Sequence, residues 1–254
     1  MYRISKQIIA IRQFFFLRIL FSSHHTRTGT SKTADMIASV FAVHISDGAL
    51  RSEWIAAGWI ALVAMVSLGI RKLDEREIPR LGLLTAALFV ASQIHFRVGV
   101  GSVHLLLNGL AGVILGPRAV VAIAIALAFQ ALLFAHGGLT TLGINGSVMG
   151  VPAVLVGSLF PIIYRVITKN GRRAKWVGVI GAATGFLAGL LTVALNVLVV
   201  SLGIEGGESV AVVIFGLYLP VILVEAVGTG IIVGYLHRVK PEWLIRENIN
   251  NPAG

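Results

Sequence analysis

Seven long apolar runs with short polar connections constrain this chain more than any other feature. They cover approximately residues 54–70, 81–96, 103–115, 119–135, 149–167, 176–202 and 210–236. Most are long enough to cross the hydrocarbon core of a bilayer as helices. Only 13% of the residues are charged, against about a quarter in a typical soluble domain, and the mean hydropathy is +0.89. We therefore predict an all-α polytopic membrane protein with about seven transmembrane helices.

The basic residues between these runs predict the orientation of the chain. They gather after the first, third, fifth and seventh runs, at Arg71, Lys72, Arg76, Arg80, Arg118, Arg165, Lys169, Arg172, Arg173, Lys175, Arg238, Lys240 and Arg246. Connections rich in Lys and Arg stay in the cytoplasm, so the transmembrane part begins outside and the C-terminus is cytoplasmic. The net charge of +10 is thus a topology signal, and we expect a multi-pass plasma membrane protein that binds no nucleic acid.

The first 42 residues differ from the rest. Their apolar stretch, residues 8–21, is interrupted by Arg12 and Arg18, which argues against a membrane span. We expect residues 1–42 to be a disordered extension that is either cleaved or absent because translation starts later. Residues 43–240 then form the transmembrane domain, and residues 241–254 form a cytoplasmic tail.

Histidines supply the most promising chemistry. His44, His95, His104 and His136 are all expected at or near the external ends of spans. Polar groups at membrane depth are costly and usually functional, and imidazole is a good ligand for divalent transition metals. The alternative for each is a packed or interfacial side chain with one hydrogen bond, which we favour for His95. Because the chain has no cysteine, thiolate metal sites and disulfides are excluded.

Three other features allow two interpretations each. The uncharged, glycine-containing connection 134–146 is either a turn or the wall of a small site. Glu225, inside the last run, is either a proton relay or bonded to Asn196 or to a backbone group. The glycines of the last two runs form a face for internal packing or for a partner subunit: Gly181, Gly185, Gly189, Gly230 and Gly234. The sequence has neither an HExxH nor a P-loop motif, so ATP hydrolysis would fall to another subunit.

Four sequence pieces together resemble a known family. They are HISDG at 44–48, GSVHLLLNGL at 101–110, QALLF at 130–134 with HGGLTTLG at 136–143, and Glu225 with Thr229. In this order they resemble the CbiM/NikM family, the substrate-specific membrane components of energy-coupling factor (ECF) transporters for cobalt and nickel. The resemblance covers residues 43 to about 240.

This resemblance implies a transport subunit, not an enzyme. It implies uptake of Co(II) or Ni(II) together with a transmembrane coupling subunit, two cytoplasmic ATPases and often a small accessory membrane protein. Cobalt would supply cobalamin synthesis, and nickel would supply urease or hydrogenase. The sequence of residues 103–110 is more similar to that of the cobalt members of the family, which favours cobalt. No permanently bound cofactor is implied.

The resemblance also implies a ligand set. In this family the mature chain begins Met-His, and the metal is held by the terminal amine, by the backbone nitrogen and imidazole of the second residue, and by a later imidazole. The matching residues are Val43, His44 and His104, with four possible lining residues: His136, Asn145, Asp47 and Asn108. The chain departs from the family because Val43 follows 42 residues. A GTG start codon at position 43, read as Met, or cleavage after Ala42 would each free the amine.

Two other functions remain open at this point. An ECF-type or secondary transporter of an organic solute, such as a vitamin, would need a larger cavity lined by aromatic and polar residues. A membrane enzyme could place zinc between His44, His104 and His136, with Asp47 as the one obvious general acid or base.

Overall fold

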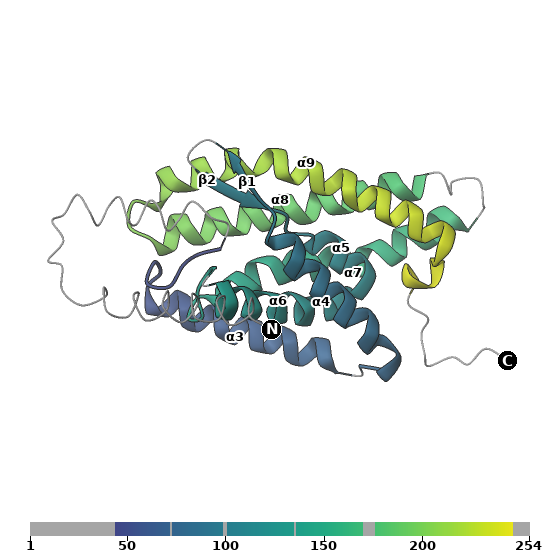
Figure 1. The fold of residues 1–254 in the computed structure, drawn as a ribbon, viewed down its shortest axis with the longest axis horizontal. Helices are drawn as coiled ribbons and strands as arrows, with labels where there is room; N and C mark the ends of the chain where they lie inside the picture. Colours follow the sequence, from purple (N-terminus) through teal and green to yellow (C-terminus); the bar gives the residue numbers. More distant parts are fainter. Residues whose placement is uncertain (1–43, 72, 99–100, 135, 170–175, 246–254) are drawn as a thin grey trace, which may run out of the picture. The chain divides into compact units, whose positions relative to one another are not determined.

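The computed structural model describes residues 44–71, 73–98, 101–134, 136–169 and 176–245 (Figure 1). The predicted extension 1–42, Val43 and residues 246–254 of the predicted tail lie outside the described residues. The helices are α3 (Ser52–Ile70), α4 (Ile78–Ser92), α5 (Asn108–Leu115), α6 (Ala119–Phe134), α7 (Leu142–Thr168), α8 (Val177–Gly203) and α9 (Gly207–Val239). Short 3-10 turns are η1 (Glu75–Glu77), η2 (Gly116–Arg118) and η4 (Pro241–Trp243).

Each apolar run overlaps one of these helices, so the predicted helical membrane fold is confirmed in its main feature. Five stretches are long and apolar enough to cross a membrane: Ser52–Ile70, Asn108–Phe134, Leu142–Thr168, Val177–Gly203 and Gly207–Val239. Helix α4 has 15 residues and α5 has eight, fewer than the ~20 that a crossing needs. The described chain is a multi-pass membrane protein with fewer full-length spans than apolar runs.

Two short strands between residues 95 and 104 form a β-hairpin, whereas the sequence predicted the ends of two helices there. Strand β1 (His95–Val98) pairs antiparallel with β2 (Gly101–His104), and the register sets His95 opposite His104. Glycine and β-branched residues alternate in this stretch, which disfavours helix and suits a short hairpin. Opposite residues in such a pair project to the same face, so the hairpin brings two histidines together.

Helices α8 and α9 lie side by side (Figure 1). A Cβ atom added at Gly181 would come within 2.6 Å of Val233, and one at Gly185 within 2.8 Å of Thr229. Small residues let the two helix backbones approach closely. The glycine face of these helices therefore serves internal packing, the blander of the two interpretations.

Helix α5 sits at the centre of the fold. All eight of its residues are buried. Gly112 lies against the backbone of α7 at Ala153, and Gly109 lies against α8 at Gly185. This enclosure places the first turn of α5 directly beneath the hairpin. Outside this core, residues such as Ile60 and Val212 expose more than 70% of their surface, as lipid-facing side chains do.

Candidate metal site

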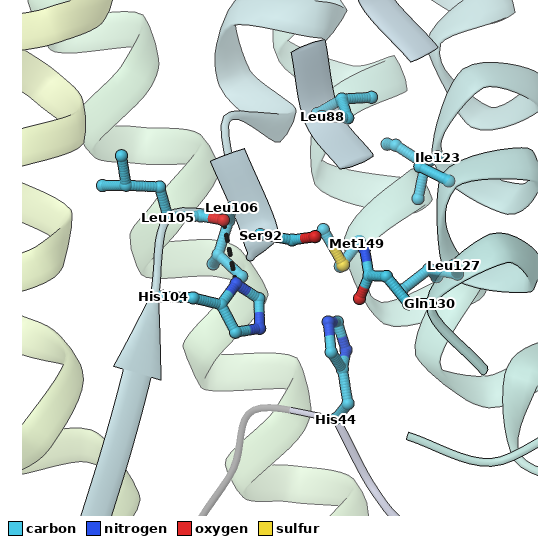
Figure 2. Close-up of a pocket in the computed structure, with 11 residues that line it drawn as sticks. His44, Leu88, Ser92, His104, Leu105, Leu106, Ile123, Leu127, Gln130 and Met149 are labelled. Atoms are coloured by element: carbon cyan, nitrogen blue, oxygen red, sulfur yellow. Dashed lines mark hydrogen bonds between the residues drawn. The ribbon is translucent and has the colours of Figure 1, made fainter. Parts of the chain in front are cut away.

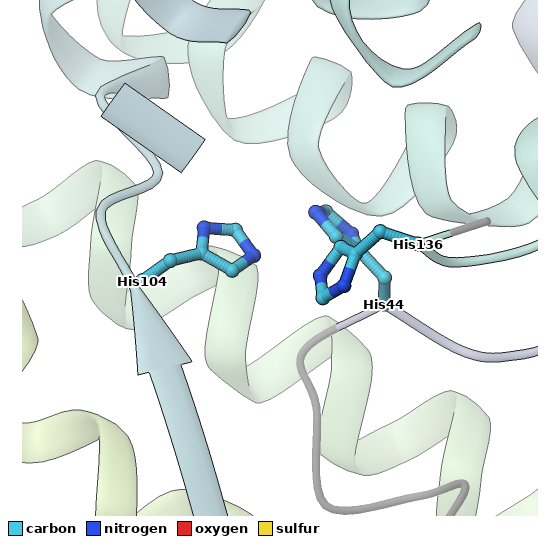
Figure 3. Close-up of side chains that lie close together, drawn as sticks. All are labelled: His44, His104 and His136. Atoms are coloured by element: carbon cyan, nitrogen blue, oxygen red, sulfur yellow. The ribbon is translucent and has the colours of Figure 1, made fainter. Parts of the chain in front are cut away.

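Three histidines from distant parts of the chain meet at one point. His44 precedes α3, His104 ends β2, and His136 lies between α6 and α7 (Figure 3). The ring centroids of His44 and His104 are 4.8 Å apart, and each lies 5.4 Å from that of His136. One ring nitrogen from each of the three lies within 4.8 Å of the others. This spacing suits imidazoles that share one ion.

The ring nitrogens of this cluster lack hydrogen-bond partners. Both nitrogens of His44 and Nε2 of His104 and His136 are buried without a partner among the described residues. An unpaired buried polar atom costs about 1–3 kcal/mol, so the fold retains an arrangement that only a ligand would satisfy. Nδ1 of His104 donates to the carbonyl of Leu105 at 2.9 Å, which leaves Nε2 as the free acceptor. Metal-binding histidines are typically oriented in this way.

Burial keeps these imidazoles neutral. It lowers the pKa of His104 to about 4, with the neighbouring His136 and His95 adding to the effect and a bond to Leu105 opposing it. Burial, followed by repulsion from the other three imidazoles, lowers the pKa of His44 well below 6.5. The pKa of His136 falls through burial and His95. Neutral imidazole is the form that binds metal, so no proton has to leave these side chains at pH 7.

The space beside His44 and His104 is small. The centre of a water-sized sphere can occupy about 10 Å³ there, enough for about one water-sized particle. Most of the wall is apolar, with Ile123, Leu127 and Met149 (Figure 2). Gln130 also lines the space, and its buried Oε1 has no partner among the described residues. The space therefore admits about one water-sized particle, with nitrogen and oxygen donors in its wall.

Asp47 anchors the segment that follows His136. Its carboxylate accepts hydrogen bonds from the Thr140 hydroxyl at 2.5 Å and from the amides of Thr140, Leu139 and Thr141 at 2.9, 3.1 and 3.3 Å. Partial burial raises the pKa of Asp47, but these bonds outweigh it and leave the pKa below its usual value. A carboxylate committed to four donors makes a poor general base, which weakens the zinc-enzyme alternative.

Asn145 holds the backbone next to His44, and it lines a small space together with His44 and His136. Its Oδ1 accepts from the amide of Ile45 and its Nδ2 donates to the carbonyl of Ile45, both at 2.9 Å. The Thr141 hydroxyl donates to the same carbonyl at 2.6 Å. Both the amide and the carbonyl of Ile45 are thus hydrogen-bonded, and the Asn145 side chain has little capacity left to bind a metal.

Asn108 and Glu225 support the segment after His104. Asn108 donates to the Thr192 hydroxyl at 2.7 Å and to the Met149 carbonyl at 3.2 Å, and it does not line the space beside the histidines. Glu225 accepts from the amides of Leu106 and Leu107. Of the two interpretations of Glu225, the structure thus supplies the hydrogen bond to a backbone group. Leu107 has a φ of 49°, a left-handed conformation that costs energy in a leucine and that this bond helps to hold.

His95 joins the cluster from the solvent side, a position that the sequence analysis missed. Its ring centroid is 5.0 Å from that of His136 and 5.5 Å from that of His104. The side chain is exposed, unlike those of His44 and His104, which expose 1% each. The pairing of strands β1 and β2 brings His95 close to His104. The sequence did not predict this hairpin, because its residues overlap two apolar runs that were interpreted as helices. Gln130 was likewise quoted only as part of a motif.

Comparisons with known proteins identify relatives of the chain. Residues 44–243 match the family model "Cobalt uptake substrate-specific transmembrane region", CbiM. A Haemophilus influenzae protein, provisionally named a metal transport protein, is 34% identical over 80% of this chain and 98% of its own length. The cobalt transport protein CbiM of Geobacter sulfurreducens is 32% identical over 84% of this chain and 64% of its own length.

Further relatives and a solved structure extend this picture. An Archaeoglobus fulgidus relative is provisionally named a fused nickel transport protein, NikMN, and a Methanocorpusculum labreanum relative a fused cobalt transport protein, CbiMQ. They are 31% and 30% identical to this chain, over 79% and 80% of it and over 67% and 35% of their own lengths. The crystal structure of a truncated transition metal transporter superposes with a TM-score of 0.60 at 25% identity. That match covers 77% of this chain and 99% of the other.

The fold and the site define a class: a helical multi-pass membrane protein in which three histidines from separate segments meet. The chain belongs to the family of cobalt uptake substrate-specific transmembrane regions, CbiM. Its relatives are transport proteins by name, and the chain is accordingly a transport component and not an enzyme. The name of one relative, a fused cobalt transport protein CbiMQ, indicates that this relative joins a CbiM part to a further transport part.

Proposed function

We propose that this chain binds one Co(II) or Ni(II) ion between His44 and His104 at the external side and passes it inward. The observation that carries the proposal is the pair of 1% exposed imidazoles, 4.8 Å apart, with ring nitrogens that no described residue satisfies. Imidazole nitrogen suits cobalt and nickel. The family description and residues 103–110 favour cobalt, and the nickel name of one relative keeps nickel as the second substrate.

The ligand set would be completed by the backbone of residues 43 and 44. We propose that the mature chain begins at position 43, so that its amine and the His44 amide nitrogen, which gives up its proton to the solution on binding, join the two imidazoles. Consecutive amine, amide and imidazole donors form fused chelate rings, which leaves little ordering entropy to lose, and four nitrogen donors suit square-planar Ni(II). Support comes from the order HIS at 44–46 and from the clamp that Asn145 places on Ile45. His136 and Gln130 would line the site.

The topology proposed here has seven crossings, an external start and a cytoplasmic C-terminus. Basic residues on alternate connections support it. The distribution of basic residues assigns four histidines to the external side: His44, His95, His104 and His136. Their rings lie close together, which also supports this topology. In this arrangement α4 and the short, fully buried α5 would cross with the help of the hairpin that joins them.

Transport would be powered by other subunits of an ECF-type complex. The sequence has no P-loop, so two cytoplasmic ATPases and a transmembrane coupling subunit are proposed, with a small accessory membrane protein as a further partner. The fused CbiMQ relative supports a coupling partner. An organic solute fits poorly, because pockets for such ligands measure about 300–1,000 Å³, whereas the space beside His44 admits about one water-sized particle.

One experiment tests the site and the start together. Co(II) affinity is measured by titration calorimetry on the chain from Met1 and on a chain from position 43, each with and without His104→Ala. We expect tight binding only in the shorter chain and its loss in His104→Ala, while His237→Ala, at the other end of α9, changes nothing. Equal binding by both chains would remove the amine from the ligand set, and no binding by either would overturn the metal function.

A further inference from the structure

We propose that His95 and His136 form an outer transit site, through which the metal ion passes on its way between the external solution and His44 and His104. This inference rests on the proposed function and adds a route to it. It assigns a role to His95, the member of the cluster that the ligand set of the inner site does not use.

Exposure falls in steps across the four histidines. His95 is exposed, His136 is half-buried, and His44 and His104 expose 1% each. The rings also lie next to one another in this sequence. The ring centroids are 5.0 Å apart between His95 and His136, 5.4 Å between His136 and either His44 or His104, and 4.8 Å between His44 and His104. Neighbouring imidazoles are thus close enough at every step for an ion to gain one ligand before it leaves another.

One ring nitrogen of His95 is held by the backbone. Its Nδ1 donates to the carbonyl of Gln93 at 3.0 Å, which leaves the lone pair on Nε2 free. The same device, a ring N–H held by a backbone carbonyl, orients His104 through Leu105. Such outer-shell bonds are characteristic of metal-binding histidines. Nε2 of His136, the other member of the outer pair, is buried without a partner among the described residues.

The hairpin holds His95 in a defined place. The ladder of β1 and β2 pairs His95 directly with His104, so the distance between an outer and an inner imidazole is set by backbone hydrogen bonds. His136 leads into Gly137, whose φ of 74° turns the chain, and the Cβ position of Gly137 lies 3.3 Å from the Cβ of His44. Two anchored segments therefore carry the outer pair to the mouth of the inner site.

An exposed outer pair solves a physical problem for a buried site. A divalent ion in water carries a full hydration shell, and moving a charge into an apolar space without compensating ligands is expensive. At His95 and His136 the ion can exchange some waters for imidazoles while the remaining waters still face solution. His136 can then stay bound while His44 or His104 replaces His95. The ion is never without ligands.

A transit site has a kinetic signature that differs from that of a permanent ligand. Because it lies on the path in both directions, its removal slows entry and exit by the same factor and leaves the dissociation constant unchanged. Loss of a permanent ligand instead raises the dissociation constant mainly through faster release.

The first test measures Co(II) binding to His95→Ala in lipid nanodiscs, in whichever chain form binds Co(II). Stopped-flow mixing gives the association rate, and mixing with excess chelator gives the release rate. We expect both rates to fall about tenfold, with less than about a twofold change in the dissociation constant. His237→Ala, which removes an imidazole far from the cluster, serves as the matched control and should leave both rates unchanged.

A second variant makes the visit of the ion visible. Since the chain has no cysteine, His95→Cys places a unique thiol at the outer site. Thiolate binds Co(II) strongly, and we expect a Co(II)–thiolate charge-transfer absorption that rises and then decays as the inner site fills. His237→Cys should show no such band.

Three results would overturn the transit site. Unchanged rates in His95→Ala would mean that the ion enters by another path. A weaker affinity with an unchanged association rate would make His95 a permanent ligand. Failure of the unsubstituted protein to bind Co(II) in either chain form would overturn the proposed function itself, and it is recognised before any His95 variant is made.

Discussion

The α8–α9 pair and the histidine cluster are built by different means. The two helices are neighbours in sequence and pack through small residues, as at Gly181 against Val233. The cluster is held by bonds between distant segments: Asn145 reaches back 100 residues to Ile45, and Asp47 binds Thr140, 93 residues ahead. The lesson is that stability resides mainly in local apolar packing, whereas the site depends on a few long-range polar contacts. Damage to one region should leave the other largely intact.

The largest effect should come from His44→Leu. It removes a proposed ligand, so Co(II) affinity should fall by more than about 100-fold. It also removes two buried ring nitrogens that lack partners, at nearly constant volume, so thermal stability without metal should rise. Calorimetric Co(II) titration and thermal unfolding of the metal-free protein measure the two effects.

A matched leucine substitution checks this reasoning. His237 bonds to the Tyr164 hydroxyl at 2.7 Å through Nδ1, so His237→Leu should lower the melting temperature and leave Co(II) affinity unchanged. If His44→Leu lowered stability as His237→Leu does, the nitrogens of His44 would be satisfied in the metal-free protein, contrary to the structure.

Asn145→Ala should weaken Co(II) binding by about 10- to 100-fold, the usual range for a residue that orients a ligand. The loss follows because both bonds to the Ile45 backbone disappear and His44 is no longer held. The release rate should rise more than the association rate falls. Unchanged affinity in this variant would show that the inner site does not depend on the long-range contact, and the comparison between the two regions would fail.

The helix pair can be perturbed alone with Gly181→Ala. Its new Cβ would meet Val233 at 2.6 Å, so we expect a loss of about 1–2 kcal/mol of stability from overpacking, with Co(II) affinity unchanged. Gly228→Ala is the matched control, because its Cβ would meet nothing within 4 Å and alanine favours helix. Chemical unfolding in detergent ranks the two variants, and equal stability would contradict the close packing of α8 and α9.

The last prediction concerns pH. Burial lowers the pKa values of His44, His104 and His136 below 6.5, so protons compete for these imidazoles only in acid, near pH 4 for His104. A terminal amine has a pKa of about 8, so an amine ligand must lose a proton at neutral pH. Binding also displaces the proton of the His44 amide, so Co(II) affinity of the chain from position 43 should fall about 100-fold per unit between about pH 7.5 and 6. A flat profile in that range would point to side-chain ligands alone.

Proximity within the cluster was the hardest part to foresee. His44 and His104 were inferred from short motifs, and the structure places them in contact. His95 was expected at the external end of a span, as a packed or interfacial side chain with one hydrogen bond. It has such a bond, to Gln93, but its place opposite His104 was not foreseen, because an apolar run concealed the hairpin. Asn145 and Asp47 were considered lining residues, and only their bonds to Ile45 and to residues 139–141 reveal that they position the site.

By itself, the sequence determined that the chain is a helical membrane protein, because the length of the apolar runs and the charges between them are local properties. It also predicted the close packing of the last two helices through the spacing of Gly181, Gly185 and Gly189. Only the tertiary structure decided which histidines meet and which polar groups hold them. The hydrogen bonds from Asn145, Glu225 and Asp47 that hold the site join residues about 90 to 120 positions apart, and no local pattern encodes such pairings. The physical reason is that His44, His104 and His136 belong to separate segments, which only the packing of the helices and the hairpin brings to one point.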